Sequence, residues 1–213
     1  MKENTNYSKL KKIFENNGGY ITREDADKSN IPSWFLSDFV KRNNLNKIAP
    51  GFYANDNYAI DDYFILQRRY PKYIFSGLNA LYLLGLTDKI PNNLEVSSPQ
   101  NYHPSRNKIN SLIVHKLSNK NVYELGIKEI KTMFGNIVKT YDEERTICDV
   151  IKYRDNFDSE TFLKAINFYV QKINNQSKLF KYAKELGIEK KVYEVMEIVS
   201  NLTQRINKTI DNE

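Results

Sequence analysis

The strongest constraint on the fold is the set of helix-starting and helix-ending residues in the first forty positions, which divides them into three short helical segments. Residues 7–16 place apolar side chains at helical spacing and stop at Gly18-Gly19, because glycine readily takes the left-handed conformation that follows a helix. A second helix is predicted to begin at Thr22, where Asp25 completes a capping-box pattern. A third is predicted to begin at Ile31-Pro32, since proline is tolerated in the first turn.

A hairpin follows the third helix. Residues 45–49 alternate like a strand, Pro50-Gly51 is a turn signal, and residues 52–54 return as a second strand. Three short helices and a hairpin predict a winged helix-turn-helix, in which the third helix enters the major groove of DNA and the hairpin lies beside the phosphates. The same arrangement also occurs as a protein-interaction module, and the pattern leaves that alternative open.

The predicted third helix has two distinct faces. At 100° per residue, one side gathers the apolar side chains expected to pack inward, namely Phe35, Leu36, Phe39 and Val40. The other side carries a tryptophan among polar residues, which indicates either a DNA-reading face or a contact with a second domain. The residues expected to contact DNA are Thr22, Arg23, Ser33, Trp34, Ser37, Lys41, Arg42 and Lys47. Arg42 and Lys47 are assigned to phosphates.

The remaining chain alternates between helical and extended patterns. Two helices are expected over 61–69 and 76–84, four short strands over 94–97, 112–115, 129–133 and 137–140, and four helices over 143–153, 160–174, 177–186 and 189–210. Ser76, Ser159 and Gln176 lie where helix caps would be. The predicted fold class is α+β, with a winged helix-turn-helix domain over 1–58 and a mixed α/β domain, with a small sheet and several helices, over 59–213.

The composition leaves little room for several kinds of chemistry. The 213 residues include one cysteine, Cys148, and two histidines, His103 and His115, whereas a zinc site needs about four such ligands. Neither histidine lies in a catalytic motif, and no glycine-rich phosphate loop occurs. We therefore expect no enzyme, no metal and no cofactor. The absence of a signal-peptide pattern and of a disulfide framework indicates a cytoplasmic protein without a membrane span.

The charge does not locate a nucleic-acid surface by itself. The net charge is +6, with nine basic and seven acidic side chains in residues 1–60 and 23 and 19 in the other 153. This excess points weakly to an acidic partner and is spread over both halves of the chain.

A family resemblance emerges from the order of these motifs. Residues 19–22 (GYIT), Ile31-Pro32 and Gly51-Phe52-Tyr53 resemble the N-terminal domain of AbiEi-type antitoxins of bacterial type IV toxin–antitoxin, or abortive-infection, systems. Residues 76–87 (SGLNALYLLGLT) and 141–150 (YDEERTICDV) are similar to the C-terminal domain of that family.

The resemblance implies two activities. The winged helix would bind inverted repeats of double-stranded DNA in the promoter of its own operon and repress it. The C-terminal domain would counteract a nucleotidyltransferase-like toxin in phage defence without forming a stable complex. Within the E-R-T segment, Arg145 and Asp149 are spaced for an ion pair along a helix, and we expect them either to serve the fold or to organise an antitoxin surface.

Two other functions stay open at this point. One is a stand-alone winged-helix transcriptional regulator without a toxin gene beside it. The other, more remote, is a metal-dependent nuclease, for which Glu129-Ile130-Lys131 offers an E-x-K fragment and Asp88 the nearest upstream acid. The apolar stripe of residues 189–210 is wide enough to pack on its own domain, so we expect a free protein that is mainly monomeric.

Overall fold

The computed structural model describes residues 5–104 and 111–210, and its packing divides the chain into an N-terminal unit, Met1–Ile65, and a C-terminal unit, Leu66–Glu213. The mixed helix and strand content confirms the α+β class. In the described residues, no helix combines the length and the apolar character needed to cross a membrane.

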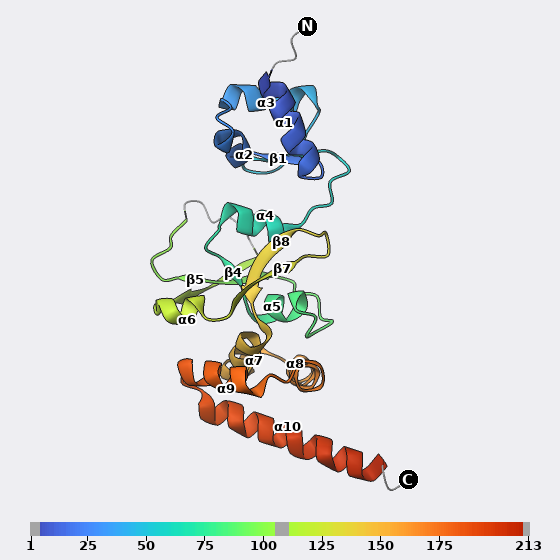
Figure 1. Ribbon diagram of the computed structural model, residues 1–213, viewed down its shortest axis with the longest axis vertical. Helices are drawn as coiled ribbons and strands as arrows, with labels where there is room; N and C mark the ends of the chain where they lie inside the picture. Colours follow the sequence, from blue (N-terminus) through green and yellow to red (C-terminus); the bar gives the residue numbers. More distant parts are fainter. Residues whose placement is uncertain (1–4, 105–110, 211–213) are drawn as a thin grey trace. The chain divides into compact units, whose positions relative to one another are not determined.

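The N-terminal unit contains three helices and a three-stranded antiparallel sheet (Figure 1). In chain order the elements are α1 (Thr5–Asn16), β1 (Tyr20–Thr22), α2 (Arg23–Lys28), α3 (Ser33–Arg42), β2 (Asn46–Ala49) and β3 (Phe52–Ala54). Strand β3 lies between β1 and β2. This is the winged helix-turn-helix that the sequence predicts, with β2 and β3 as the wing.

The three helices enclose a small apolar core. Phe35, Leu36 and Phe39 of α3 are buried in it and Val40 is half-buried, which confirms the predicted inward face. The turn between α2 and α3 is closed by Asn30, whose φ of 55° lies in the left-handed region, and by the N–H of Ile31, which donates to the carbonyl of Ala26 at 2.9 Å. Asparagine takes the place that glycine often has after a helix.

A second, aromatic cluster covers the sheet of the N-terminal unit. The ring of Tyr20 stacks on Phe52 at 4.8 Å between centroids and meets the edges of Tyr58 at 5.4 Å and Phe64 at 5.5 Å. Residues 55–65 therefore pack as part of this unit. The division between the units falls between Ile65 and Leu66, inside helix α4 (Asp62–Arg69), seven residues after the boundary that the sequence predicts.

We expect Phe64→Ala to lower the free energy of unfolding by about 1–2 kcal/mol, because it removes a half-buried ring from this aromatic cluster. Urea denaturation of the full chain measures the change. Ile60→Ala is the matched control, since Ile60 lies four residues earlier and is exposed. Equal stability of the two variants would show that residues 59–65 do not support the N-terminal unit.

The C-terminal unit is built on a five-stranded mixed sheet. Its strands are β4 (Ile74–Phe75), β5 (Leu94–Pro99), β6 (Leu112–Leu117), β7 (Ile127–Lys131) and β8 (Ile137–Tyr141), in the order β6-β5-β4-β8-β7. β5 and β6 are parallel, as are β4 and β8, while the other two pairs are antiparallel. The sequence analysis missed β4 because two residues carry no alternation.

The helices of this unit gather mainly at one end of the sheet, with α7, α8, α9 and α10 together (Figure 1). They are α5 (Gly77–Leu83), α6 (Lys120–Glu124), α7 (Glu143–Lys152), a 3₁₀ turn (Arg154–Asn156), α8 (Ser159–Lys172), α9 (Gln176–Glu185) and α10 (Glu189–Ile210). Helix α7 is the most deeply buried of them, and it contacts α5, α8, α9 and α10. The four predicted long helices are confirmed to within two residues at each end.

Three predicted caps differ in the structure. Ser76 occupies the cap position of α5, but its hydroxyl makes no capping bond, and the carboxylate of Glu95 accepts the N–H of Leu78 at 3.1 Å instead. The caps of α8 and α9 are Asp158 and Asn175, each one residue before the serine and glutamine expected from the sequence. In both helices the carboxylate or amide oxygen reaches the third N–H of the first turn.

Candidate nucleic-acid interface

The outward face of α3 is open to solvent. Ser33, Ser37 and Lys41 are exposed, and Trp34 is 66% exposed, although an isolated tryptophan is usually covered at least in part. The hydroxyl of Ser37 donates to the carbonyl of Ser33 at 3.0 Å, which orients it and leaves its lone pairs able to accept a hydrogen bond. The polar face of α3 and its tryptophan are thus exposed, as the helical projection of the sequence predicts.

The cations of this face differ in their surroundings. Arg42 pairs with Asp38 one turn earlier, with Nε and Oδ2 2.8 Å apart. Lys41 and Lys47 are exposed and make no ion pair with any described residue. A phosphate would therefore bind the two lysines without displacing a partner, whereas Arg42 would have to leave Asp38.

One of the expected DNA contacts, Thr22, has a structural role, and another, Arg23, is engaged in an ion pair at the surface. Thr22 is only 4% exposed, because its hydroxyl accepts the N–H of Asp25 at 3.1 Å and donates to the carboxylate of Asp25 at 2.6 Å. That capping box confirms the predicted start of α2, and it withdraws the Thr22 side chain from the surface. Arg23 is exposed and pairs with Asp27 at 2.9 Å.

The wing is tied to the helices by its turn. The N–H of Arg23 donates to the carbonyl of Gly51 at 2.7 Å, and Gly51 has a φ of 75°, which favours glycine. Lys47 on β2 lies opposite Tyr53 on β3. The wing and the start of α2 are thus held together, so the position of Lys47 follows from the fold of the unit.

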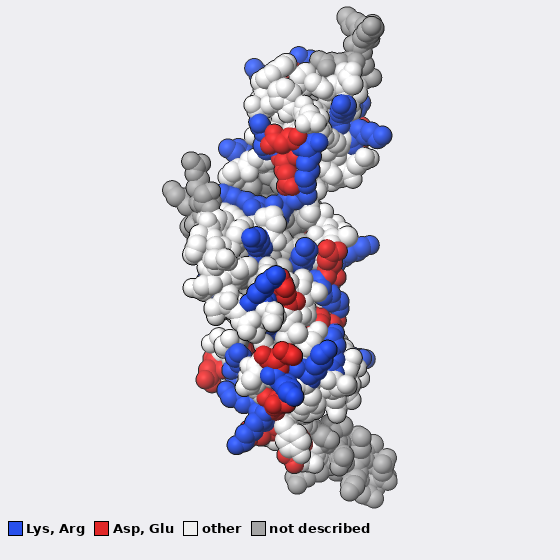
Figure 2. All heavy atoms as spheres, turned by 60° about the vertical axis from the view of Figure 1, so that its left-hand side comes forward, with Lys and Arg blue, Asp and Glu red and all other residues white. Residues whose placement is uncertain are grey.

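Sequence reasoning overlooked a further group of cations on α1. Lys9, Lys11 and Lys12 are exposed and have no ion pair among the residues that the structure describes. Helix α1 packs on α3, where the hydroxyl of Tyr7 donates to Asn43 at 3.3 Å. The sequence shows this group as three lysines within four residues. The sequence analysis considered only the apolar side of the helix. The visible face of the molecule mixes both charges (Figure 2).

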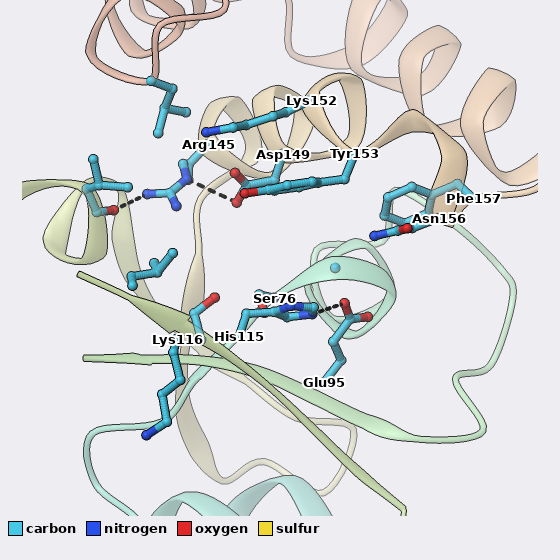
Figure 3. Close-up of a pocket in the computed structure, with 15 residues that line it drawn as sticks. Ser76, Glu95, His115, Lys116, Arg145, Asp149, Lys152, Tyr153, Asn156 and Phe157 are labelled. Carbon is cyan, nitrogen blue, oxygen red and sulfur yellow. Dashed lines mark hydrogen bonds and ion pairs between the residues drawn. The ribbon is translucent and has the colours of Figure 1, made fainter. Parts of the chain in front are cut away.

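The Arg145–Asp149 pair lies inside the C-terminal unit (Figure 3). The guanidinium of Arg145, with a side chain 3% exposed, donates from Nε to Asp149 at 3.0 Å and from Nη1 to the carbonyls of Val122 and Leu125. Burial raises the pKa of Asp149 above its usual range, against the opposing effect of the guanidinium. The predicted ion pair is present, and it lines a cavity instead of forming an open surface.

The E-x-K fragment considered for a nuclease lies on the edge strand β7, where Glu129 and Lys131 are both exposed. Asp88, in the loop after α5, pairs with Lys164 at 3.3 Å. Within 5–104 and 111–210, no three histidine, cysteine, aspartate or glutamate side chains are grouped to hold a metal ion. The geometry therefore gives the nuclease hypothesis no support.

His115 makes the other ion pair at the same cavity. Its Nε2 lies 2.7 Å from Oε1 of Glu95, and this hydrogen bond raises the pKa of His115 above 6.5, with burial acting in the opposite direction. Because the folded pKa is raised, the pair contributes its full stability below about pH 6.5 and loses it as the pH rises through the folded pKa.

We expect Glu95→Gln to lower the NMR titration midpoint of His115, since glutamine keeps the oxygen that caps α5 but removes the negative charge. The difference in unfolding free energy between the parent protein and this variant should shrink above the folded pKa. Glu124→Gln is the control, because Glu124 is an exposed glutamate paired with Lys120. An unchanged midpoint in Glu95→Gln would contradict the assignment.

Three comparisons bear on identity. No curated protein matches the chain. Among solved structures, the RV2827C protein from Mycobacterium tuberculosis matches with a TM-score of 0.54 at 11% identity, over 85% of this chain and 72% of that one, which shows a shared fold. Residues 8–55 match the family described as "Transcriptional regulator, AbiEi antitoxin", and this match spans the three helices and the wing. Residues 8–55, which form the winged helix, are therefore similar to a family of AbiEi antitoxin transcriptional regulators.

Proposed function

We propose that the protein is the antitoxin of a type IV toxin–antitoxin system that represses its own operon and acts in phage abortive infection. The observation that carries the proposal is the coincidence of the family match, residues 8–55, with a winged helix whose third helix leaves Trp34 and Lys41 open. We place the protein in the cytoplasm, where its DNA lies.

The DNA-binding half of the proposal rests on α3 and the wing. Ser33, Trp34, Ser37 and Lys41 approach the major groove, where the hydroxyl groups read base edges and the indole ring packs against them. The ammonium of Lys41 contacts a phosphate at the edge of the groove. Arg23, Arg42 and Lys47 contact phosphates, which fix the register of the unit on the duplex.

The antitoxin half rests on the C-terminal unit and on the family. We propose that residues 59–213, which comprise the C-terminal unit and the last residues of the N-terminal one, counteract a nucleotidyltransferase-like toxin without forming a stable complex. Arg145 and Asp149 act there by fixing α7 against α6, because the Arg145 side chain is too buried to touch a protein partner.

We further propose that the free protein is mainly monomeric. Val192, Met196 and Val199 of α10 are buried against the core of the same unit, and Val195 packs beside them. Leu202 and Ile206, which complete the predicted stripe, lie outside the described side chains. Two copies would load on inverted repeats, one at each half-site.

A salt series tests the DNA contacts. We expect Lys41→Ala and Lys47→Ala each to weaken binding to any duplex and to lower the slope of log affinity against log salt by about 0.9 per lost phosphate contact. Lys28→Ala is the control, because Lys28 is held by Glu24 at 2.6 Å. A Trp34→Ala, Lys41→Ala double variant with full promoter affinity in a gel shift would exclude α3.

Asp38→Asn should act in the opposite direction. It frees the Arg42 guanidinium from its ion pair and removes a negative charge from the face of α3. Affinity for a duplex should therefore rise, by roughly two- to tenfold at low salt, and the rise should vanish in Asp38→Asn, Arg42→Ala. Fluorescence anisotropy with labelled DNA measures the affinities of the single and the double variant. Weaker binding by Asp38→Asn alone would mean that Asp38 itself reads a base.

Toxin protection separates the two halves. With the adjacent toxin gene under an unrelated promoter, a full-length Lys41→Ala, Lys47→Ala variant should still rescue growth, because repression is no longer needed. The winged helix alone, residues 1–65, should not rescue. The second candidate, a stand-alone regulator, predicts no toxin gene next to this one and no rescue by any variant.

A further inference from the structure

A cavity of about 220 Å³ lies inside the C-terminal unit, between strands β5 and β6 and the end of α7. Charged and polar side chains converge on it (Figure 3). Those that matter to the argument are Ser76, Glu95, His115, Arg145, Lys152 and Tyr153. A concave site with a few convergent polar groups is the usual form of a small-molecule site.

One end of the cavity carries an excess of positive charge. Arg145 uses Nε and Nη1 for Asp149 and two carbonyls, which leaves Nη2 without a partner among the described residues. Lys152 lines the same cavity from the same helix, with its ammonium 5.6 Å from the ring centroid of Tyr153, and it makes no ion pair with a described residue. The two cations of α7 that line the cavity are accompanied there by one carboxylate of that helix, Asp149, and a bound anion would balance the remaining charge.

The middle of the cavity has the form of a slot. The rings of Tyr153 and His115 are both seen nearly edge-on in Figure 3, one on each side of the open space. His115 is held in place by Glu95 at 2.7 Å, and Phe157 lines the end away from Arg145. Facing rings favour a flat ligand, because aromatic surfaces stack on one another.

A buried hydroxyl lines the same cavity without a partner. Ser76 is 4% exposed, and its Oγ makes no hydrogen bond with any residue that the structure describes, although it sits at the cap position of α5, where Glu95 has taken over the capping. A buried hydroxyl without a hydrogen bond is unfavourable, because it has given up its bonds to water. The fold does not use this group, so a ligand that bonds to it would replace a lost hydrogen bond.

We propose that this cavity binds a small flat anion, a single ring that bears one carboxylate or phosphate group, with the ring between Tyr153 and His115 and the anionic group on Arg145 Nη2 and Lys152. The volume sets the size, since sites for drug-sized ligands measure roughly 300–1,000 Å³. Of the two carboxylates that line the cavity, Asp149 is paired with the Arg145 guanidinium, and Glu95 is hydrogen-bonded to His115 at the other side, which is a cation when it is protonated. The ammonium of Lys116 is turned away and donates to the carbonyl of Tyr102.

A series of matched probes tests the proposal on the full chain. Benzoate, benzamide and benzamidine share one ring and differ in charge, while phenyl phosphate and inorganic phosphate separate the ring from the anionic group. We expect benzoate and phenyl phosphate to shift the backbone amide NMR signals of residues 76, 115 and 145–153, with benzoate binding at least tenfold tighter than benzamide. Benzamidine should leave the signals unchanged, and inorganic phosphate should bind more weakly than phenyl phosphate.

Two surface variants assign the groups. Lys152→Gln should weaken benzoate at least tenfold and leave benzamide unchanged, with Lys152→Arg restoring most of the affinity. Lys172→Gln is the matched control, because Lys172 is also the last residue of a helix, α8. Tyr153→Ala should weaken the binding of benzoate and phenyl phosphate and leave the binding of inorganic phosphate unchanged. Circular dichroism confirms that each variant is folded.

Equal affinity for benzoate, benzamide and benzamidine would overturn the proposal, as would shifts confined to residues outside the cavity. An unchanged benzoate affinity in Lys152→Gln would also overturn it. Since none of these measurements uses DNA or a toxin, the outcome is independent of the proposed antitoxin function.

Discussion

The buried guanidinium of Arg145 is the interaction on which the C-terminal unit depends. It joins α7 to the end of α6 through the carbonyls of Val122 and Leu125, and it lies 4.2 Å from the ring of Tyr141. A Cβ at Gly126 would lie 2.8 Å from the Cβ of Arg145, so the chain can pass this close only as glycine. Leaving such a charge unpaired costs several kcal/mol, which makes the position of α7 specific.

This constraint also explains the E-R-T segment as a structural motif. Glu144, Arg145 and Thr146 are all nearly inaccessible, and Lys178 of α9 pairs with both Glu144, at 2.7 Å, and Asp142, at 3.0 Å. The polar residues that gave the segment its resemblance to a family therefore hold the helices together. A partner surface would have to be sought among exposed residues of the same unit.

The sequence was sufficient wherever the determining interaction is local. The capping box at Thr22, the inward face of α3 and the wing turn at Gly51 each depend on residues within a few positions, and each was predicted. Prediction from the sequence failed where the local structure depends on a residue that is distant in the chain. Ser76 looked like a cap, but Glu95, brought in by β5, takes that role. The cavity was not predicted at all, because Glu95, His115 and Arg145 lie on three elements that only the fold brings together.

The distribution of charge would limit the proposed binding of the winged helix to DNA. Most acidic side chains of the N-terminal helices lie one turn from a basic one, as in Arg23–Asp27, Lys28–Glu24 and Arg42–Asp38, and such pairs reduce the attraction to phosphate. In the N-terminal unit, the exposed lysines without an ion pair to a described residue are Lys9, Lys11, Lys12, Lys41 and Lys47. Under the proposed function, we expect one copy to bind a random duplex weakly, with a salt dependence set by these lysines. Useful affinity then has to come from base contacts by the open face of α3, and from loading two copies on one site. A repressor of the proposed kind would depend on its operator sequence more than a strongly basic protein does.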